Sequence, residues 1–119
     1  MYDNSTTIQE LKNKIAQFTK EREWEQFHSS KNLSMSIAIE AAELMEKFQW
    51  LDDKESKKEL LEHRAEIENE IADIASYILS FCNVNNIDLS QAIDNKIKLN
   101  AQKYPIEKSK GKSDKYTKL

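Results

Sequence analysis

Hydrophobic positions follow helical spacing along most of the chain. The first stretch forms one apolar stripe on an otherwise charged helix, at Ile8, Leu11, Ile15 and Phe18. Thr7 and Glu10 have the spacing of a capping box, which predicts the start of this helix. We expect the helix to fade near Glu23 and residues 24–32 to form a loop or a broken turn.

A second stretch is apolar almost all round the helix axis. It lies in a helix predicted over residues 33–50, and between Leu33 and Met45 the only charged residues are Glu40 and Glu43. A helix that is apolar on all sides is usually a buried one. We therefore expect this helix to be covered by other elements or by a partner chain.

A third stretch has the same character in its second half. Ser56 and Glu59 form a capping-box pattern that predicts a helix running to about Cys82. The first half of this predicted helix is charged, whereas the segment from Ile71 to Cys82 contains a single charge, on Asp73. The second half is therefore expected to be buried as well.

The remaining pattern predicts a fourth helix and an all-α fold. After a short loop at residues 83–88, Asp88 or Ser90 caps a helix that Pro105 ends. The whole chain has one Gly and one Pro, which argues against hairpins and sheets. We expect a four-helix bundle over residues 1–105 and a Lys-rich tail over residues 106–119. Two helices are too apolar for a lone bundle of this size, so a homodimer or higher oligomer is expected.

Composition narrows the functional classes. The 119 residues fit one domain, and a net charge of −3 argues against nucleic-acid binding. Cys82 is the only cysteine, so no internal disulfide forms and a reducing compartment is expected. The polar segment from Met1 to Thr7 does not resemble a signal peptide, and no apolar run of about 18 residues predicts a membrane helix. We expect a cytoplasmic protein that does not bind membranes.

Two pairs of carboxylates carry the candidate chemistry. Glu40 and Glu43 lie one turn apart on one helix face, and Glu70 and Asp73 repeat this spacing on another helix. Carboxylates in apolar surroundings are costly unless they are paired or bind a metal, and no Lys or Arg lies within either apolar run. Four oxygen ligands would suit Mg²⁺, with Mn²⁺ as an alternative.

The two carboxylate pairs have other interpretations besides a magnesium site. A Glu pair at this spacing most often belongs to a solvated helix face. Di-iron chemistry needs Glu-x-x-His pairs on two helices, and the two histidines, His28 and His63, do not supply them. Phosphate chemistry with a divalent cation is the metal-dependent reading that remains.

The residues around these pairs resemble a known family. The segments 40–43 and 70–73 look like the Glu-x-x-Glu and Glu-x-x-Asp signature of MazG-like all-alpha NTP pyrophosphatases. The flanking segments are similar to the dCTP pyrophosphatase branch of that family, at residues 23–28, 31–33, 48–50, 96–105 and 115–117. One position departs from the pattern, since Ile15 stands where vertebrate members of that branch have a His.

The resemblance implies an activity and a ligand set. A nucleoside triphosphate, here dCTP, would react with water to give the monophosphate and pyrophosphate. Magnesium would be held by the four carboxylates, Glu40, Glu43, Glu70 and Asp73. One carboxylate would act as the base that activates water; the resemblance does not determine which one, and we expect it to be Glu43. The active site would be shared between subunits of a homodimer or homotetramer.

Substrate contacts follow from the same matched segments. Lysines suit the phosphates, and the candidates are Lys31, Lys96 and Lys103. Aromatic rings stack on bases, and the candidates are Trp24, Phe27, Trp50 and Tyr77. Asn100 and His28 can read a base edge, and Tyr104 lies in the last matched segment. Each could instead be ordinary surface or core.

Two other functions remain open. One is a broad-specificity, house-cleaning NTP pyrophosphatase, because the metal motif does not determine which base is accepted. The other is a non-enzymatic helical oligomerisation module whose acidic face binds a basic partner. Pyrophosphate release across the common nucleotides, with and without magnesium, distinguishes the three.

Overall fold

Helices form all the regular structure of residues 1–119, which the computed structural model describes in full, and no strand is present. This confirms the all-α class. The chain divides into two compact units, residues 1–86 and residues 87–119, and each is described by itself. The first unit contains α1 (Tyr2–Ser5), α2 (Ile8–Glu21), the 3₁₀ helix η1 (Glu25–Phe27), α3 (Ser30–Glu46), α4 (Asp53–Glu62) and α5 (Arg64–Asn85).

Local capping determines where α2 and α3 begin. The predicted capping box of α2 is present, since the Glu10 backbone N–H donates to the Thr7 hydroxyl and the Thr7 N–H donates to the Glu10 carboxylate. Helix α3 begins at Ser30, earlier than predicted. The Ser29 hydroxyl accepts a bond of 3.1 Å from the Asn32 N–H and so caps the earlier start.

The single helix predicted from Ser56 to Cys82 is wrong. The structure has two helices there, and the capping box that opens α4 is formed by Asp52 and Glu55, with Ser56 inside the helix. His63 separates α4 from α5 with a non-helical backbone conformation (φ −124°, ψ 33°). The chain therefore has five helices of ten or more residues, where four were predicted.

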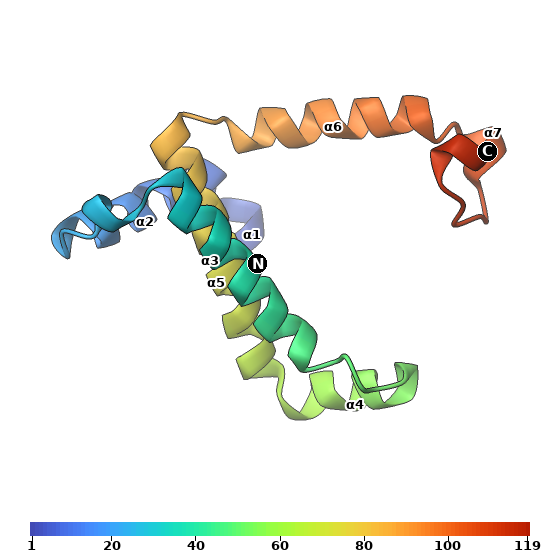
Figure 1. Ribbon diagram of the computed structural model, residues 1–119, viewed down its shortest axis with the longest axis horizontal. Helices are drawn as coiled ribbons and strands as arrows, with labels where there is room; N and C mark the ends of the chain where they lie inside the picture. The colour runs from blue at the N-terminus through green and yellow to red at the C-terminus, as the bar shows by residue number, and fades with distance from the viewer. The chain divides into compact units, whose positions relative to one another are not determined.

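Helix α5 is the element on which the first unit is assembled. Helices α2, α3 and α4 all pack against it, and α3 lies beside it along most of its length (Figure 1). Leu33 on α3 is 1% exposed and lies in a core with three residues of α5, namely Ile67, Leu79 and Cys82.

The two apolar stretches are only partly covered within one chain. On α3 the side chains of Met35, Ile39 and Met45 are about half exposed, and Ile71 on α5 is 51% exposed. Each helix is therefore covered on one side only, and the expectation that both stretches are buried is met only in part. Large apolar side chains remain at the surface of a single copy.

The second unit consists of α6 (Leu89–Lys103), α7 (Ile106–Ser109) and the 3₁₀ helix η2 (Tyr116–Lys118). Asp88 caps α6 as predicted, by accepting a bond of 2.9 Å from the Gln91 N–H. The Tyr116 ring contacts the Tyr104 ring edge-on at 6.1 Å, and the Lys103 ammonium lies 5.0 Å from its centre. No helix is long and apolar enough to cross a membrane.

Candidate functional site

Three of the four predicted carboxylates lie together. Glu40 and Glu43 on α3 face Glu70 on α5, and one oxygen from each lies within 4.8 Å of the others. The grouping follows from the sequence spacing, because residues three apart share a helix face and α3 packs beside α5. We call these three residues the acidic group.

Burial and mutual repulsion raise the pKa of two of these carboxyl groups. Burial, followed by the hydrogen bond and charge of Glu43 and by the charges of Asp73 and Glu70, raises the pKa of Glu40 to about 7. Burial and the neighbouring Glu43 also raise the pKa of Glu70. One oxygen of Glu40 and one of Glu70 are buried without any hydrogen-bond partner.

These features fit a divalent cation. A buried carboxylate oxygen without a donor is costly, and it is satisfied when it binds a cation. Oxygen ligands from carboxylates are those that Mg²⁺ and Mn²⁺ take. The acidic group could therefore hold a metal ion, with the unpartnered oxygens of Glu40 and Glu70 as two of its ligands.

Asp73, the fourth predicted ligand, lies one turn along α5 from Glu70. It is not part of the acidic group, although its charge contributes to the raised pKa of Glu40. It lines a neighbouring cavity of about 490 Å³. Asp73 therefore lies between the acidic group and this cavity.

A lysine beside the acidic group was missed by the sequence reasoning. The Lys47 ammonium forms an ion pair with Glu66 at 3.6 Å, and its positive charge acts against the rise in the pKa of Glu70. Lys47 follows Glu43 by four residues, and Glu66 precedes Glu70 by four, so the ion pair lies one turn from the acidic group on both helices. This spacing could have identified Lys47 once α3 and α5 were paired.

The cavity that Asp73 lines is walled by three aromatic residues, and we call it the aromatic cavity. Phe18 and Trp24 meet edge to face with ring centroids 5.8 Å apart, and Tyr77 comes from α5. Its other lining residues are Lys14, Ile15, Thr19, His28, Ser76 and Ser80. Three predicted substrate contacts, Trp24, His28 and Tyr77, thus line one cavity together with a predicted metal ligand.

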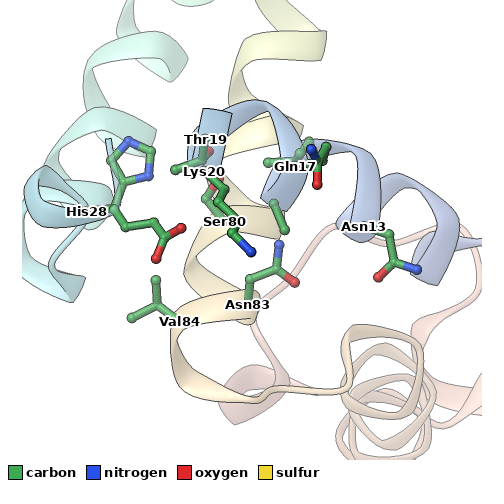
Figure 2. Close-up of a pocket in the computed structure, with 11 residues that line it drawn as sticks. Asn13, Gln17, Thr19, Lys20, His28, Ser80, Asn83 and Val84 are labelled. Carbon is green, nitrogen blue, oxygen red and sulfur yellow. The ribbon is translucent and has the colours of Figure 1, made fainter. Parts of the chain in front are cut away.

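A second cavity of about 400 Å³ lies between α2 and α5 (Figure 2). Three amide side chains help to line it, from Asn13, Gln17 and Asn83, and we call it the amide cavity. Its other lining residues are Ile15, Ala16, Thr19, Lys20, Glu25, His28, Ser80 and Val84. Four residues line both cavities: Ile15, Thr19, His28 and Ser80.

The other predicted contacts lie outside these cavities. Lys31 is exposed in the first turn of α3, Phe27 is exposed in η1, and Trp50 is 86% exposed after α3. The remaining four belong to the second unit and are exposed: Lys96, Asn100, Lys103 and Tyr104. A substrate role for all of these residues stays a prediction.

Comparison with known proteins gives a consistent result. Residues 35–119 match the MazG-like family. The dCTP pyrophosphatase 1 of Mus musculus is 36% identical over 115 residues, which are 95% of this chain and 68% of that protein. The dCTP pyrophosphatase 1 of Homo sapiens is 33% identical over the same shares of both chains.

A solved structure is similar as well. The crystal structure of a pyrophosphatase from Archaeoglobus fulgidus superposes with a TM-score of 0.79 at 40% sequence identity. The similarity covers 82% of this chain and 91% of the archaeal one. The fold described above is therefore also that of an experimentally determined pyrophosphatase.

Proposed function

Since the chain belongs to the MazG-like family, we propose that it is a nucleotide pyrophosphatase that converts dCTP to dCMP and pyrophosphate. The observation that supports this most directly is the placement of the acidic group next to the aromatic cavity, with Asp73 between them. A triphosphate needs cations at one end and its base needs an apolar, stacking environment at the other. The acidic group, which could hold a cation, and the aromatic cavity both lie in one unit of this chain, which supports the proposal.

Magnesium is the proposed cofactor, with manganese as the alternative. Glu40, Glu43 and Glu70 would hold it, and Asp73 is proposed as a fourth ligand. The chemistry that such a cation would supply is to offset the negative charge that a triphosphate brings to an acidic site. The two unpartnered buried oxygens of Glu40 and Glu70 support this proposal.

Glu43 is the proposed base for the attacking water. It is the exposed member of the acidic group, whereas Glu40 and Glu70 are half-buried, so a water molecule can reach it. Its carboxylate would take a proton from water as the water oxygen bonds to phosphorus. The anhydride bond between the α and β phosphates would then break, and pyrophosphate would leave.

Substrate contacts are proposed on the same basis. Trp24 and Tyr77 would border the base, and His28 would meet its edge, because all three line the aromatic cavity. Trp50, Asn100 and Tyr104 are further proposed contacts for the nucleoside, and Lys31, Lys96 and Lys103 for the phosphates. These six rest on the sequence resemblance alone.

A second copy of the chain is the proposed partner. About half of each of the Met35, Ile39 and Met45 side chains is exposed on α3, and Ile71 is exposed on α5. Helices that are apolar on several sides need further cover, which a homodimer or homotetramer would supply. Such an assembly would also bring residues of another subunit within reach of each site.

Pyrophosphate release from dCTP, dTTP, dUTP, dATP and dGTP, with magnesium and with a chelator, tests the proposal. We expect magnesium-dependent release and the highest kcat/KM with dCTP. Equal kcat/KM on all five would favour the broad-specificity alternative. Absence of release from every nucleotide would favour the oligomerisation module. With Asn100→Ala, an unchanged preference for dCTP would remove Asn100 from the site.

A further inference from the structure

Two hydroxyl side chains are buried at the place where the two cavities meet. Thr19 on α2 is 8% exposed and Ser80 on α5 is 7% exposed, and they are the only buried polar residues of the chain. Both line the aromatic cavity and the amide cavity. Figure 2 shows them facing the same pocket from two different helices.

Neither hydroxyl is used by the protein itself. The side-chain hydrogen bonds nearby are made by other groups, such as the Asn83 amide, which donates to the Lys12 carbonyl oxygen at 3.0 Å. No side-chain hydrogen bond involves Thr19 or Ser80, although both are more than nine-tenths buried. Their oxygens are not among the side-chain oxygens that are fully enclosed without a partner, which belong to Glu40, Glu70 and Ser109. The two hydroxyls therefore open into the cavities and can bond to a molecule that enters there.

Ser80 lies on the same face of α5 as Glu70 of the acidic group, which places the Thr19 and Ser80 hydroxyls in line with the acidic group. Glu70, Asp73, Tyr77 and Ser80 follow one another at three- and four-residue intervals, so they lie on one face of α5. The helical rise places Ser80 about 10 Å along the axis from Asp73. A nucleoside triphosphate can span this separation, with its phosphates toward Asp73 and the far edge of its base toward Ser80.

We propose that the hydroxyls of Thr19 and Ser80 bind the C4 edge of a pyrimidine base, by accepting a hydrogen bond from an amino group there or by donating one to a carbonyl oxygen. This inference rests on the proposed function, because it places the phosphates at the acidic group. Ile15 borders the same space but cannot replace the hydroxyls, since it has no polar side-chain atom.

The chemistry of a hydroxyl explains why the proposed subsite can bind more than one pyrimidine base. A hydroxyl rotates, so it can accept a bond from the amino group of cytosine or donate one to the carbonyl oxygen of thymine or uracil. Two hydroxyls therefore hold the C4 edge without choosing between these bases. Any preference for dCTP over dTTP must come from other groups.

The test compares three pyrimidine substrates that carry different groups at C4; dTTP also differs from the other two at C5, where it has a methyl group. These are dCTP, dTTP and the triphosphate of 2-pyrimidinone deoxyriboside, which carries no substituent at C4. The variants are Thr19→Val and Ser80→Ala, each of which removes one hydroxyl. Ser36→Ala is the matched control, because Ser36 is half-buried on α3 and lines neither cavity.

Each variant should lower kcat/KM for dCTP and for dTTP by about twofold to tenfold, the usual effect of one hydrogen bond. The ratio of dCTP to dTTP should stay unchanged, and hydrolysis of the pyrimidinone nucleotide should match that of Ser36→Ala. A uniform loss on all three substrates would overturn the inference, as would no loss on any. If one variant loses its cooperative thermal melt, the other decides the question.

Binding of dCMP, measured by calorimetry, separates this inference from the proposed function. If the wild type hydrolyses no triphosphate but binds dCMP more tightly than either variant, the inference stands and the proposed activity is wrong. If the wild type hydrolyses dCTP and both variants match it in hydrolysis and in dCMP binding, the inference is wrong and the activity stands. Absence of both hydrolysis and dCMP binding would overturn both.

Discussion

The raised pKa of Glu40 predicts how magnesium binding depends on pH. With a pKa of about 7, against an ordinary value of 4.5, Glu40 holds its proton more tightly in the folded chain than in the unfolded one. This contribution to stability is fully present below about pH 4.5 and is lost as the pH rises through about 7. Metal binding acts in the opposite direction, because a cation needs the ionised carboxylate.

The magnitude follows from this pKa. Glu40 is about nine-tenths protonated at pH 6 and about one-tenth protonated at pH 8. Binding of magnesium should therefore release about 0.9 proton from Glu40 at pH 6 and about 0.1 at pH 8. The apparent affinity should fall roughly tenfold between pH 8 and pH 6, and the raised pKa of Glu70 can only increase this fall.

Isothermal titration of the metal-free protein with magnesium, in buffers of different ionisation enthalpy, measures both the affinity and the protons released. Glu40→Gln should bind magnesium more weakly and show a smaller pH dependence. Glu46→Gln is the matched control, since Glu46 is exposed near the end of α3 and lies outside the acidic group; it should behave as the wild type. Equal magnesium affinity at pH 6 and pH 8 in the wild type would refute the reasoning.

Three further outcomes are expected. Glu43→Ala or Asp73→Ala should lower pyrophosphate release by at least about 100-fold. Circular dichroism melts of these variants without metal should show an unchanged or higher Tm. If either variant keeps wild-type activity, the active site lies elsewhere. Leu33 is 1% exposed, so Leu33→Ala should lower the free energy of unfolding by about 2–5 kcal/mol in urea titrations. A loss of unfolding free energy no larger than that of Ser36→Ala would contradict the described core. Light scattering at micromolar concentration should give a dimer or larger species, and a monomer would argue against a shared site.

The parts of the fold that were predicted correctly depend on local sequence. The caps at Thr7 and Asp88 need only residues within one turn, so the sequence identifies them. The start predicted at Ser56 failed because Asp52 and Glu55 offer the same pairing four residues earlier. The break at His63 has no Gly or Pro to mark it, and it lies where α4 ends and α5 begins to pack along α3.

The candidate site likewise contains residues that the sequence identifies and residues that only the packing of helices reveals. Glu40 and Glu43 could be linked to Glu70 because helical spacing and apolar surroundings mark each pair in the sequence. Thr19 and Ser80 carry no such mark, since single hydroxyls on amphipathic helices are common. Their significance depends on burial and on two cavities, which only the packing of α2 against α5 creates.

Helix α5 carries Glu70 and Asp73 near its middle and Ser80 two turns later without interruption. One inserted residue between Asp73 and Ser80 would rotate everything beyond it by about 100° and turn Ser80 away from the cavities. Natural variation in this stretch should therefore occur by substitution and not by a change of length. A relative could acquire a different base preference through one or two side chains at the cavity end of α5, while its acidic residues stay where they are.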